Sequence, residues 1–424
     1  MNVAQTLANY VQDPTAPKPP HLPRPTGLDH IPDHVPADLV LSAGLMNGED
    51  FLAEPYVYMA NLHRDFPPVF YNVSFYVNGW TLTKHEDCLF MLRNADAFRN
   101  LDAVPFPRDE DDYFFFIPQE IDPPHHRKYR NIVDPLFCPA GIKKLEGLIR
   151  QRAIDLIEGF EHDGGCEFTT AFGRPLPVSV FLDVMGLPQD MLPTFVEWAD
   201  QMIHGETPEV MGAALAKAVA YLKTAIAEKK ANPDQGVISL IANAEIDGRP
   251  LSDKEVFGFV CFLFIGGLDT VYATLNNIWA WLAQNPDRVQ EIIDRPDDID
   301  AIVEELLRRF SVTFSSRVVT KEIAIRGVTM MPGDRVSSCL PAANFDPEVF
   351  TDPLTVDFNR PRKTILAFTV GVHSCMGGHL ARMELKVALQ EWLKRLPKFS
   401  LKPGAQIVYK PGGVIGPDIV PLIW

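Results

Sequence analysis

The chain has 424 residues, of which 46% are hydrophobic, so it is long enough to bury a large apolar core. Its formal net charge of −16 argues against nucleic acid as a partner. Six scattered cysteines without a Cys-x-x-Cys pair indicate neither a disulfide framework nor a zinc site, and a reducing compartment is the simplest interpretation.

The N-terminal segment, residues 1–36, is rich in proline and polar residues. We interpret it as an arm that precedes one folded unit, residues 37–424. The arm contains no apolar stretch that would serve as a signal peptide or an anchor. The longest apolar run, residues 256–268, is too short to span a bilayer. We therefore expect a cytoplasmic protein that does not enter a membrane.

Residues 70–83 contain two β-type runs around Asn78-Gly79, a dipeptide typical of a tight hairpin turn. A loop rich in proline, acids and aromatic residues follows over residues 100–121. Helical patterns then dominate residues 122–310. Near their start, His126 and Arg130 are four residues apart, so they share one face of the predicted helix.

A long helix is predicted between Ser252, which forms a capping box with Glu255, and a stop at Asn285-Pro286. Its roughly 33 residues would span about 50 Å. Gly266-Gly267 lies inside this helix, where each glycine costs about 1 kcal/mol relative to alanine. Asp269-Thr270 follows at once in an apolar run. A buried, satisfied carboxylate and a threonine bonded to its own helix would explain the pair structurally, but the combination favours a pocket where a ligand lies against the helix.

Further along the helical region, Glu305 and Arg308 are three residues apart, so their side chains lie on one helical face. Alone, this spacing indicates an ordinary ion pair. Short strands are predicted over residues 317–340, with turns at Arg326-Gly327 and at Gly333.

The stretch Phe368-x-x-Gly371-x-His373-x-Cys375-x-Gly377 places one cysteine in a glycine-rich loop just before a predicted helix over residues 378–396. A single cysteine is more often a small buried hydrophobe, but such a residue has no need of the glycines around it. The helix start should lower the pKa of the thiol and favour the thiolate. A thiolate held in this way can be the axial ligand of a haem iron.

This spacing, followed by Leu380-Ala381, is the haem-binding signature of the cytochromes P450. From about residue 50 onward the chain resembles soluble bacterial members of that family, close to the camphor 5-monooxygenases. The resemblance implies a mainly α fold with a smaller β part. The fold would be a single triangular-prism domain, with haem b between the long distal helix and the proximal Cys375 loop.

The resemblance also implies a role for each motif. Cys375 would bind the iron as a thiolate. Gly266 and Gly267 would make room for O2, and Asp269 and Thr270 would be the catalytic pair that supplies protons. Further haem contacts are implied for His126, Arg130, Arg317, Phe368, His373 and Gly377. Glu305 and Arg308 would form a structural pair on the proximal side of the haem.

Seven residues are expected to line the substrate pocket: Phe114, Phe115, Phe116, Phe262, Ile265, Thr313 and Val414. The camphor enzymes have a tyrosine that hydrogen-bonds the ketone where this chain has Phe114, with Tyr113 one residue earlier. Their aspartate near a haem propionate is replaced by Ser315. Because a phenyl ring cannot donate that hydrogen bond, we expect a compact hydrocarbon, such as a monoterpenoid or norisoprenoid, rather than camphor.

These features predict a monooxygenase that uses O2. The sequence has no Gly-x-Gly-x-x-Gly fingerprint. Electrons should therefore come from separate proteins. We expect a [2Fe–2S] ferredoxin with a NAD(P)H-dependent reductase, docking near Arg127 and Arg130. Two alternatives stay open: a peroxide-driven peroxygenase, against which the acid–threonine pair argues, and a haem-based sensor or ligand-binding protein, which usually carries an output domain.

Overall fold

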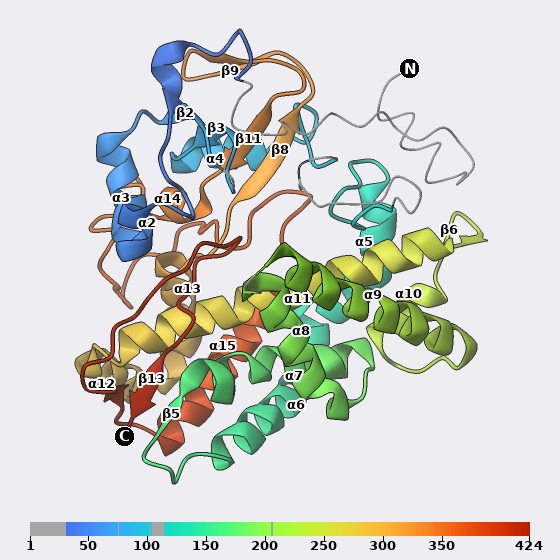
Figure 1. The fold of residues 1–424 in the computed structure, drawn as a ribbon, viewed down its shortest axis with the longest axis vertical. Helices are drawn as coiled ribbons and strands as arrows, with labels where there is room; N and C mark the ends of the chain where they lie inside the picture. Colours follow the sequence, from blue (N-terminus) through green and yellow to red (C-terminus); the bar gives the residue numbers. More distant parts are fainter. Residues whose placement is uncertain (1–30, 75, 102, 104–113, 205–206) are drawn as a thin grey trace.

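A computed structural model describes residues 31–424, except residues 75, 102, 104–113, 205 and 206. Most of the predicted N-terminal arm therefore lies outside the described residues. Figure 1 shows a strand-rich part at the top, covered by short helices, and a larger helical part below it. The predominance of helix over a smaller sheet part confirms the predicted fold class.

The largest sheet has six strands in the order β1-β2-β3-β11-β8-β4. Its strands are β1 (Val40–Leu41), β2 (Val69–Asn72), β3 (Gly79–Leu82), β4 (Phe98–Arg99), β8 (Ser315–Val319) and β11 (Arg335–Ser338). The smaller sheets contain β5 (Gly165–Glu167), β6 (Glu245–Ile246), β7 (Arg249–Pro250), β9 (Ile323–Ile325), β10 (Val328–Met330), β12 (Ser400–Leu401) and β13 (Pro421–Ile423). The predicted turn at Arg326-Gly327 joins β9 to β10, and both of its residues have positive φ.

The predicted hairpin between β2 and β3 forms, but its expected two-residue turn is wrong. Gly79 is the first residue of β3 and pairs with Asn72, so residues 73–78 connect the strands. The side chain of Asn72 holds this connection by donating to the carbonyl oxygen of Val77. Gly79 has a φ of +119°, and a Cβ there would lie 2.6 Å from the carbonyl oxygen of Arg335. The glycine therefore serves the close approach of β11 rather than a tight turn.

The helices form most of the remaining structure. They are α2 (Glu49–Ala53), α3 (Pro55–Asp65), α4 (His85–Arg93), α5 (His126–Phe137), α6 (Pro139–Glu158), α7 (Pro175–Met185), α8 (Leu192–His204), α9 (Pro208–Ala231), α10 (Val237–Ala242), α11 (Asp253–Leu282), α12 (Pro286–Asp294), α13 (Ile299–Arg309), α14 (Leu340–Asn344) and α15 (Gly378–Arg395). Short 3-10 turns cover η1 (Ala37–Leu39), η3 (Gln189–Met191) and η4 (Pro296–Asp298), and η2 (Thr169–Gly173) is a short π-helix.

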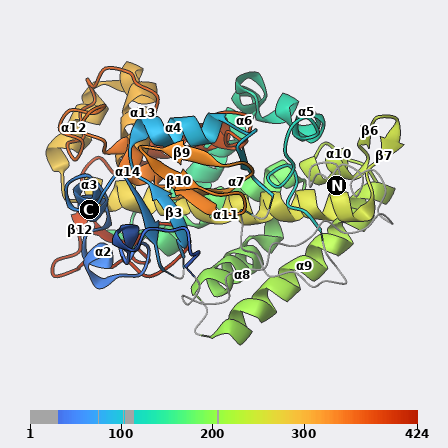
Figure 2. The same ribbon diagram turned by 90° about the horizontal axis from the view of Figure 1, so that it is seen from above.

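Helix α11 is the long helix that the sequence predicts, and Figure 2 shows it running along much of the molecule. It has 30 residues, and the capping box between Ser252 and Glu255 is present. Trp279 of α11 and Trp392 of α15 are both fully buried, with ring centroids 5.7 Å apart, and Phe168 stacks on Trp279 at 5.0 Å. This aromatic cluster fixes α11 relative to α15, and thereby relative to the Cys375 loop.

Within the part of the chain that the structure describes, two helices are long and apolar enough to cross a membrane when judged by length and composition alone: residues 209–231 of α9, and α11. In α11, 56% of the most apolar window is buried within the fold, as expected for a core helix. In α9 the buried share is 22%.

Candidate functional site

The loop that carries Cys375 is held by its own backbone. The N–H of Cys375 donates to the carbonyl oxygen of Phe368 at 2.9 Å. Between them, Thr369 and Gly371 have positive φ values of 54° and 82°. A Cβ on Gly371 would lie 2.5 Å from the carbonyl oxygen of Leu92. Glycine is therefore required where the loop approaches α4, which fixes the position of the cysteine.

The Cys375 thiol lies deep in the protein, but its surface is open to an internal cavity. Burial raises the pKa of the thiol above its ordinary value, because desolvation outweighs the backbone N–H groups of Gly377 and Gly378 and the charges of Arg130 and Arg382. The expected lowering of the thiol pKa by the helix start is thus wrong in its net direction. Coordination to a metal ion would itself deprotonate the thiol.

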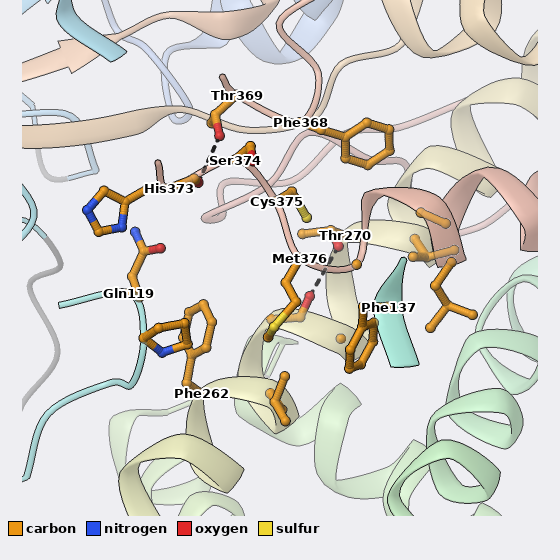
Figure 3. A pocket seen from close by; sticks show the side chains of 18 of the residues that line it. Gln119, Phe137, Phe262, Thr270, Phe368, Thr369, His373, Ser374, Cys375 and Met376 are labelled. Carbon is orange, nitrogen blue, oxygen red and sulfur yellow. Dashed lines mark hydrogen bonds between the residues drawn. The ribbon is translucent and has the colours of Figure 1, made fainter. Parts of the chain in front are cut away.

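The cavity beside Cys375 has a volume of about 270 Å³ and lies between the Cys375 loop and α11. Figure 3 shows Cys375 and Thr270 directed into the same space from these two elements. All the residues expected to contact the haem line it: His126, Arg130, Gly266, Gly267, Arg317, Phe368, His373, Cys375 and Gly377. Residues separated by up to 251 positions in the chain are therefore brought into one site.

Two of these glycines leave open space where a side chain would project. A Cβ on Gly266 or on Gly377 would meet no atom within 4 Å. Gly267 differs, because its Cβ would lie 3.1 Å from the ring of Phe181 on α7. Gly266 and Gly377 therefore form a cradle on opposite sides of the cavity, while Gly267 allows α7 to pack closely against α11.

Arg317 on β8 is a buried cation in the cavity wall, only 2% exposed. Its Nη1 donates to Ser315 Oγ at 2.9 Å and to the carbonyl oxygen of Ser316 at 2.7 Å. Among the described residues it has no carboxylate within salt-bridge distance. Burial lowers its pKa to about 10, so it stays charged at neutral pH. A buried cation of this kind favours an anionic group in the cavity.

His126 and His373 lie against each other beside this cation, with ring centroids 4.4 Å apart. Neither ring nitrogen of His373 has a hydrogen-bond partner in the described part of the chain, although Asp122 Oδ1 is 3.4 Å from Nε2. Burial lowers the pKa of both histidines, that of His126 to about 3. Both rings are therefore neutral at pH 7 and each has one N–H to donate. Together with Arg130 and Arg317, they fit the carboxylates of a haem.

Thr270 and Asp269 face different surroundings although they are adjacent in α11. Thr270 lines the cavity and donates from Oγ1 to the carbonyl oxygen of Gly266 at 3.3 Å. The carboxylate of Asp269 is not part of the cavity wall. It is buried on the side of α11 that faces Arg174 and Tyr272, and burial raises its pKa to about 6.

Glu305 and Arg308 form a buried ion pair in α13, with Arg308 Nε 2.8 Å from Glu305 Oε2 and Nη2 2.8 Å from Oε1. Arg308 is 1% exposed, and its remaining N–H groups donate to three backbone carbonyls. Arg360 also donates to Glu305, at 3.1 Å. The pair holds the segment around residues 344–360, which precedes the Cys375 loop.

Most of the residues expected to line the substrate pocket lie outside the cavity beside Cys375. Only Phe262 lines the cavity. Phe114 packs on Phe257, with ring centroids 4.8 Å apart, next to a separate surface groove between α9 and α11. The others lie outside the cavity wall: Phe115, Phe116, Ile265, Thr313 and Val414. Tyr113 lies outside the described residues.

Several cavity residues were not expected from the sequence: Gln119, Phe181, Leu263, Val271, Phe314 and Glu384. Figure 3 shows Gln119 pointing toward His373. The position of Glu384 in the cavity wall could have been predicted from the sequence, because Gly377, Leu380 and Ala381 precede it at helical spacing and all line the cavity. The position of Phe181 could not have been predicted in this way, because almost all residues of α7 are buried and the sequence does not indicate which of them face the cavity.

Comparisons with known proteins agree with this geometry. The cytochrome P450 family model matches residues 299–414. The probable cytochrome P450 127A1 of Sinorhizobium fredii is 34% identical over 402 residues, 93% of this chain and 97% of the relative. The crystal structure of cytochrome P450 CYP101C1 superposes with a TM-score of 0.84 at 29% identity, covering 93% of this chain and all of the other. That of CYP101J2 gives 0.81 at 30% identity, with 93% and 99% covered.

Cytochromes P450 are monooxygenases that carry haem b through a cysteine thiolate and use O2 and a redox partner. The residues around Cys375 fit that group, since an open cradle, a buried unpaired cation and two neutral imidazoles surround one thiol. By its similarity to a relative over nearly the whole chain, and by its superposition on solved structures, this protein belongs to the cytochrome P450 family.

Proposed function

We propose that this protein hydroxylates a small, mostly hydrocarbon substrate, such as a monoterpenoid or norisoprenoid, with O2 and two electrons from a [2Fe–2S] ferredoxin. The observation that carries the proposal is one cavity, with a mostly apolar lining, into which both the Cys375 thiol and the Thr270 hydroxyl project. We also propose that the protein acts in the cytoplasm, as a single haem domain over residues 37–424.

Cys375, in the loop that leads into α15, would hold the haem through its thiolate. The guanidinium groups of Arg130 and Arg317 would bind the haem carboxylates, helped by the N–H groups of His126 and His373. When bound, the haem supplies the activation of O2 and the insertion of one oxygen atom into a C–H bond.

Thr270 and Asp269 would supply the protons that this chemistry consumes. Thr270 places a hydroxyl in the wall of the cavity next to the open space at Gly266. The pKa of Asp269, about 6, lies near the working pH, so its carboxyl group can both gain and lose a proton. This supports a role for Asp269 as the source of the protons that the reaction consumes. Thr270 would then hold such a proton at its Oγ1, next to the reacting group.

The apolar lining of the cavity supports a hydrocarbon substrate. On the α7 and α11 side the apolar lining includes Phe181, Phe262, Leu263 and Val271, and Phe314 contributes from the chain before β8. No tyrosine hydroxyl lines the cavity in the described part of the chain. A ketone-specific hydrogen bond of the camphor type is therefore not favoured.

The electron donor would dock on the proximal face beside α5. Arg127 is suited to this contact, because its side chain is 73% exposed. Arg130 points inward and is 15% exposed, so it would act on the haem side rather than at the partner surface. An acidic ferredoxin, reduced by a NAD(P)H-dependent reductase, would be attracted to Arg127 despite the negative net charge of the whole chain.

Two measurements test the proposal. Terpenoids, norisoprenoids and camphor are titrated into the ferric protein, and those that bind next to the iron should shift it from low to high spin. Turnover of the best ligand is then measured with ferredoxin, reductase and NAD(P)H, and separately with peroxide alone. Turnover only with the electron donors supports the monooxygenase, whereas efficient turnover with peroxide would favour the peroxygenase, and binding without turnover the sensor.

The ligand assignment has its own variant. Cys375→Ser should lose the red-shifted carbon monoxide band that marks thiolate ligation. Cys138→Ser is a matched control, because Cys138 is a partly exposed cysteine at the end of α5 that does not line the cavity. Persistence of the band in Cys375→Ser would exclude Cys375 as the ligand.

A further inference from the structure

Gln119 brings a neutral amide group into the cavity wall, and Figure 3 shows its side chain directed toward His373. The hydroxyl groups of Thr270 and Thr369, which also line the cavity, donate to backbone carbonyl oxygens at 3.3 Å and 3.1 Å. The amide of Gln119 has no hydrogen-bond partner among the described residues, whereas its backbone carbonyl oxygen accepts from Asn100 Nδ2 at 2.9 Å. A polar group that faces a cavity without a partner is available to a ligand.

The backbone that carries Gln119 is fixed by a closed turn over residues 116–120. The N–H of Glu120 donates to the carbonyl oxygen of Phe116 at 2.7 Å, and the N–H of Phe116 donates to Glu120 Oε2 at 2.8 Å. Glu120 and Asn100 are both buried, at 1% and 0% exposed. Because none of these bonds uses the side chain of Gln119, the turn fixes where the amide projects and leaves its hydrogen-bonding atoms unused.

The same segment lies against two sides of the cavity. The ring centroids of Phe116 and Phe262 are 6.3 Å apart, and Phe262 belongs to α11 and lines the cavity. Asp122, three residues after Gln119, has its Oδ1 3.4 Å from Nε2 of His373. The amide is therefore placed between the apolar residues of α11 and the Cys375 loop.

We propose that Gln119 is a specificity-determining residue: its amide hydrogen-bonds one neutral oxygen of the substrate, a carbonyl or a hydroxyl group, on an otherwise hydrocarbon skeleton. The inference rests on the proposed function and narrows its substrate class to monoterpenoids or norisoprenoids that carry such an oxygen. The NH2 group of the amide can donate to a ketone, and the whole amide can both donate to and accept from an alcohol.

The charges around the cavity favour a neutral group at this position. Arg130 and Arg317 line the same cavity and would bind a carboxylate in preference to an uncharged amide. A ligand without oxygen displaces water from the amide and offers it no partner. Such a ligand should therefore bind about tenfold more weakly than contact with the apolar wall alone would allow.

Menthone, menthol and p-menthane test the inference, because they share one carbon skeleton and carry a ketone, a hydroxyl group and no oxygen. Each is titrated into the ferric, haem-loaded protein, and its dissociation constant is taken from the shift from low to high spin. Gln119→Met keeps an unbranched side chain and removes the amide. The ratio of the p-menthane constant to the menthone constant should fall about tenfold in this variant, and the ratio of p-menthane to menthol should fall as well.

Gln189→Met is a matched control. Gln189 is also partly buried, but it does not line the cavity, and both atoms of its amide are bonded to Ser179, at 2.9 Å and 2.8 Å. This variant should leave both ratios unchanged. Gln119→Asn, which withdraws the amide by one methylene group, should show part of the fall seen in Gln119→Met.

Unchanged ratios in Gln119→Met would overturn the inference. Haem transfer to an excess of apomyoglobin identifies the competing role of the amide: faster haem release from Gln119→Met with unchanged ratios would assign Gln119 to a haem carboxylate instead. Equal binding of all three ligands by the wild type would contradict the inference and leave the hydrocarbon substrate class intact. Absence of a spin shift with any of the three would contradict that substrate class, and the inference with it.

Discussion

Arg130 connects helix α5 to the Cys375 loop, because its Nη1 donates to the carbonyl oxygen of Ser374 at 2.8 Å. Its Nε donates to Asp134 Oδ1 at 2.7 Å, one turn further along α5. The guanidinium is thereby oriented from two sides, and it lines the cavity next to the residue that precedes Cys375. A planar group with several donors is needed to make these contacts together.

Arg130→Lys should therefore weaken retention of the haem. A lysine keeps the charge but cannot donate to Ser374, to Asp134 and to a haem carboxylate at the same time. Loss of one hydrogen bond to a charged group predicts haem release about ten to a hundred times faster. The measurement is haem transfer to an excess of apomyoglobin. Arg127→Lys, at an exposed position three residues earlier, should release haem at the wild-type rate.

Thr270→Ala should keep NAD(P)H consumption but divert it from product to hydrogen peroxide. The hydroxyl is the polar group of α11 that faces the cavity beside Gly266. Without the Thr270 hydroxyl, water rather than a group in a fixed position delivers the proton that the reaction consumes. The measurement is the ratio of product to NAD(P)H consumed, expected to fall by about tenfold or more.

Two further threonine variants make that result specific. Thr270→Ser keeps the hydroxyl and should restore most of the coupling. Thr274→Ala removes a hydroxyl one turn later, which donates to the carbonyl oxygen of Thr270 at 2.9 Å and does not line the cavity. Coupling as poor in Thr274→Ala as in Thr270→Ala would point to a general disturbance of α11.

Glu305→Gln should destabilise the fold, because it leaves the buried charge of Arg308 without its partner. Breaking a buried pair of this kind costs about 3–5 kcal/mol. The adjacent Glu304 pairs with Arg382 near the surface, with 38% of its side chain exposed. Glu304→Gln should therefore cost less than about 1 kcal/mol. Thermal unfolding of the two haem-loaded variants compares them, and equal midpoints would show that burial of the Glu305 pair is unimportant.

Features fixed by local interactions were predictable from the sequence. The bounds of α11 follow from the capping box at Ser252 and the Asn285-Pro286 stop, which act within one turn of each end. The residues that the Cys375 loop contributes to the cavity could be predicted from the spacing of one short motif, Phe368 to Gly377. The turn expected at Asn78-Gly79 was wrong because a strand far along the chain, β11, requires the close approach at Gly79.

Features that depend on competing long-range effects were not predictable. The start of α15 acts on the Cys375 thiol, but burial by residues distant in the chain outweighs it and raises the pKa. Phe114 was expected in the substrate pocket, yet it packs on Phe257 at the first turns of α11.

Glu384 makes stability depend on pH in a direction opposite to that of most carboxylates. It is 2% exposed, and its Oε2 has no hydrogen-bond partner among the described residues. Burial raises its pKa to about 8, whereas in the unfolded chain it ionises near 4.5. A raised pKa means that the folded state binds the proton more tightly. Its stabilising effect is complete below pH 4.5, decreases as pH rises, and is lost once pH passes about 8.

Glu384→Gln should remove this dependence, because the amide stays neutral. Between about pH 5 and 8 the free energy of unfolding of the variant should rise relative to that of the wild type by up to about 1.4 kcal/mol for each pH unit. The thermal unfolding midpoint, measured as a function of pH, follows this difference. Glu391, two turns later in α15, is a control of opposite sign: it is paired with Arg150 and Arg395, which lower its pKa. Glu391→Gln should lower the midpoint at neutral pH. Parallel curves of midpoint against pH for the wild type and Glu384→Gln would mean that Glu384 is ionised in the folded protein, and that the cavity provides it with a partner.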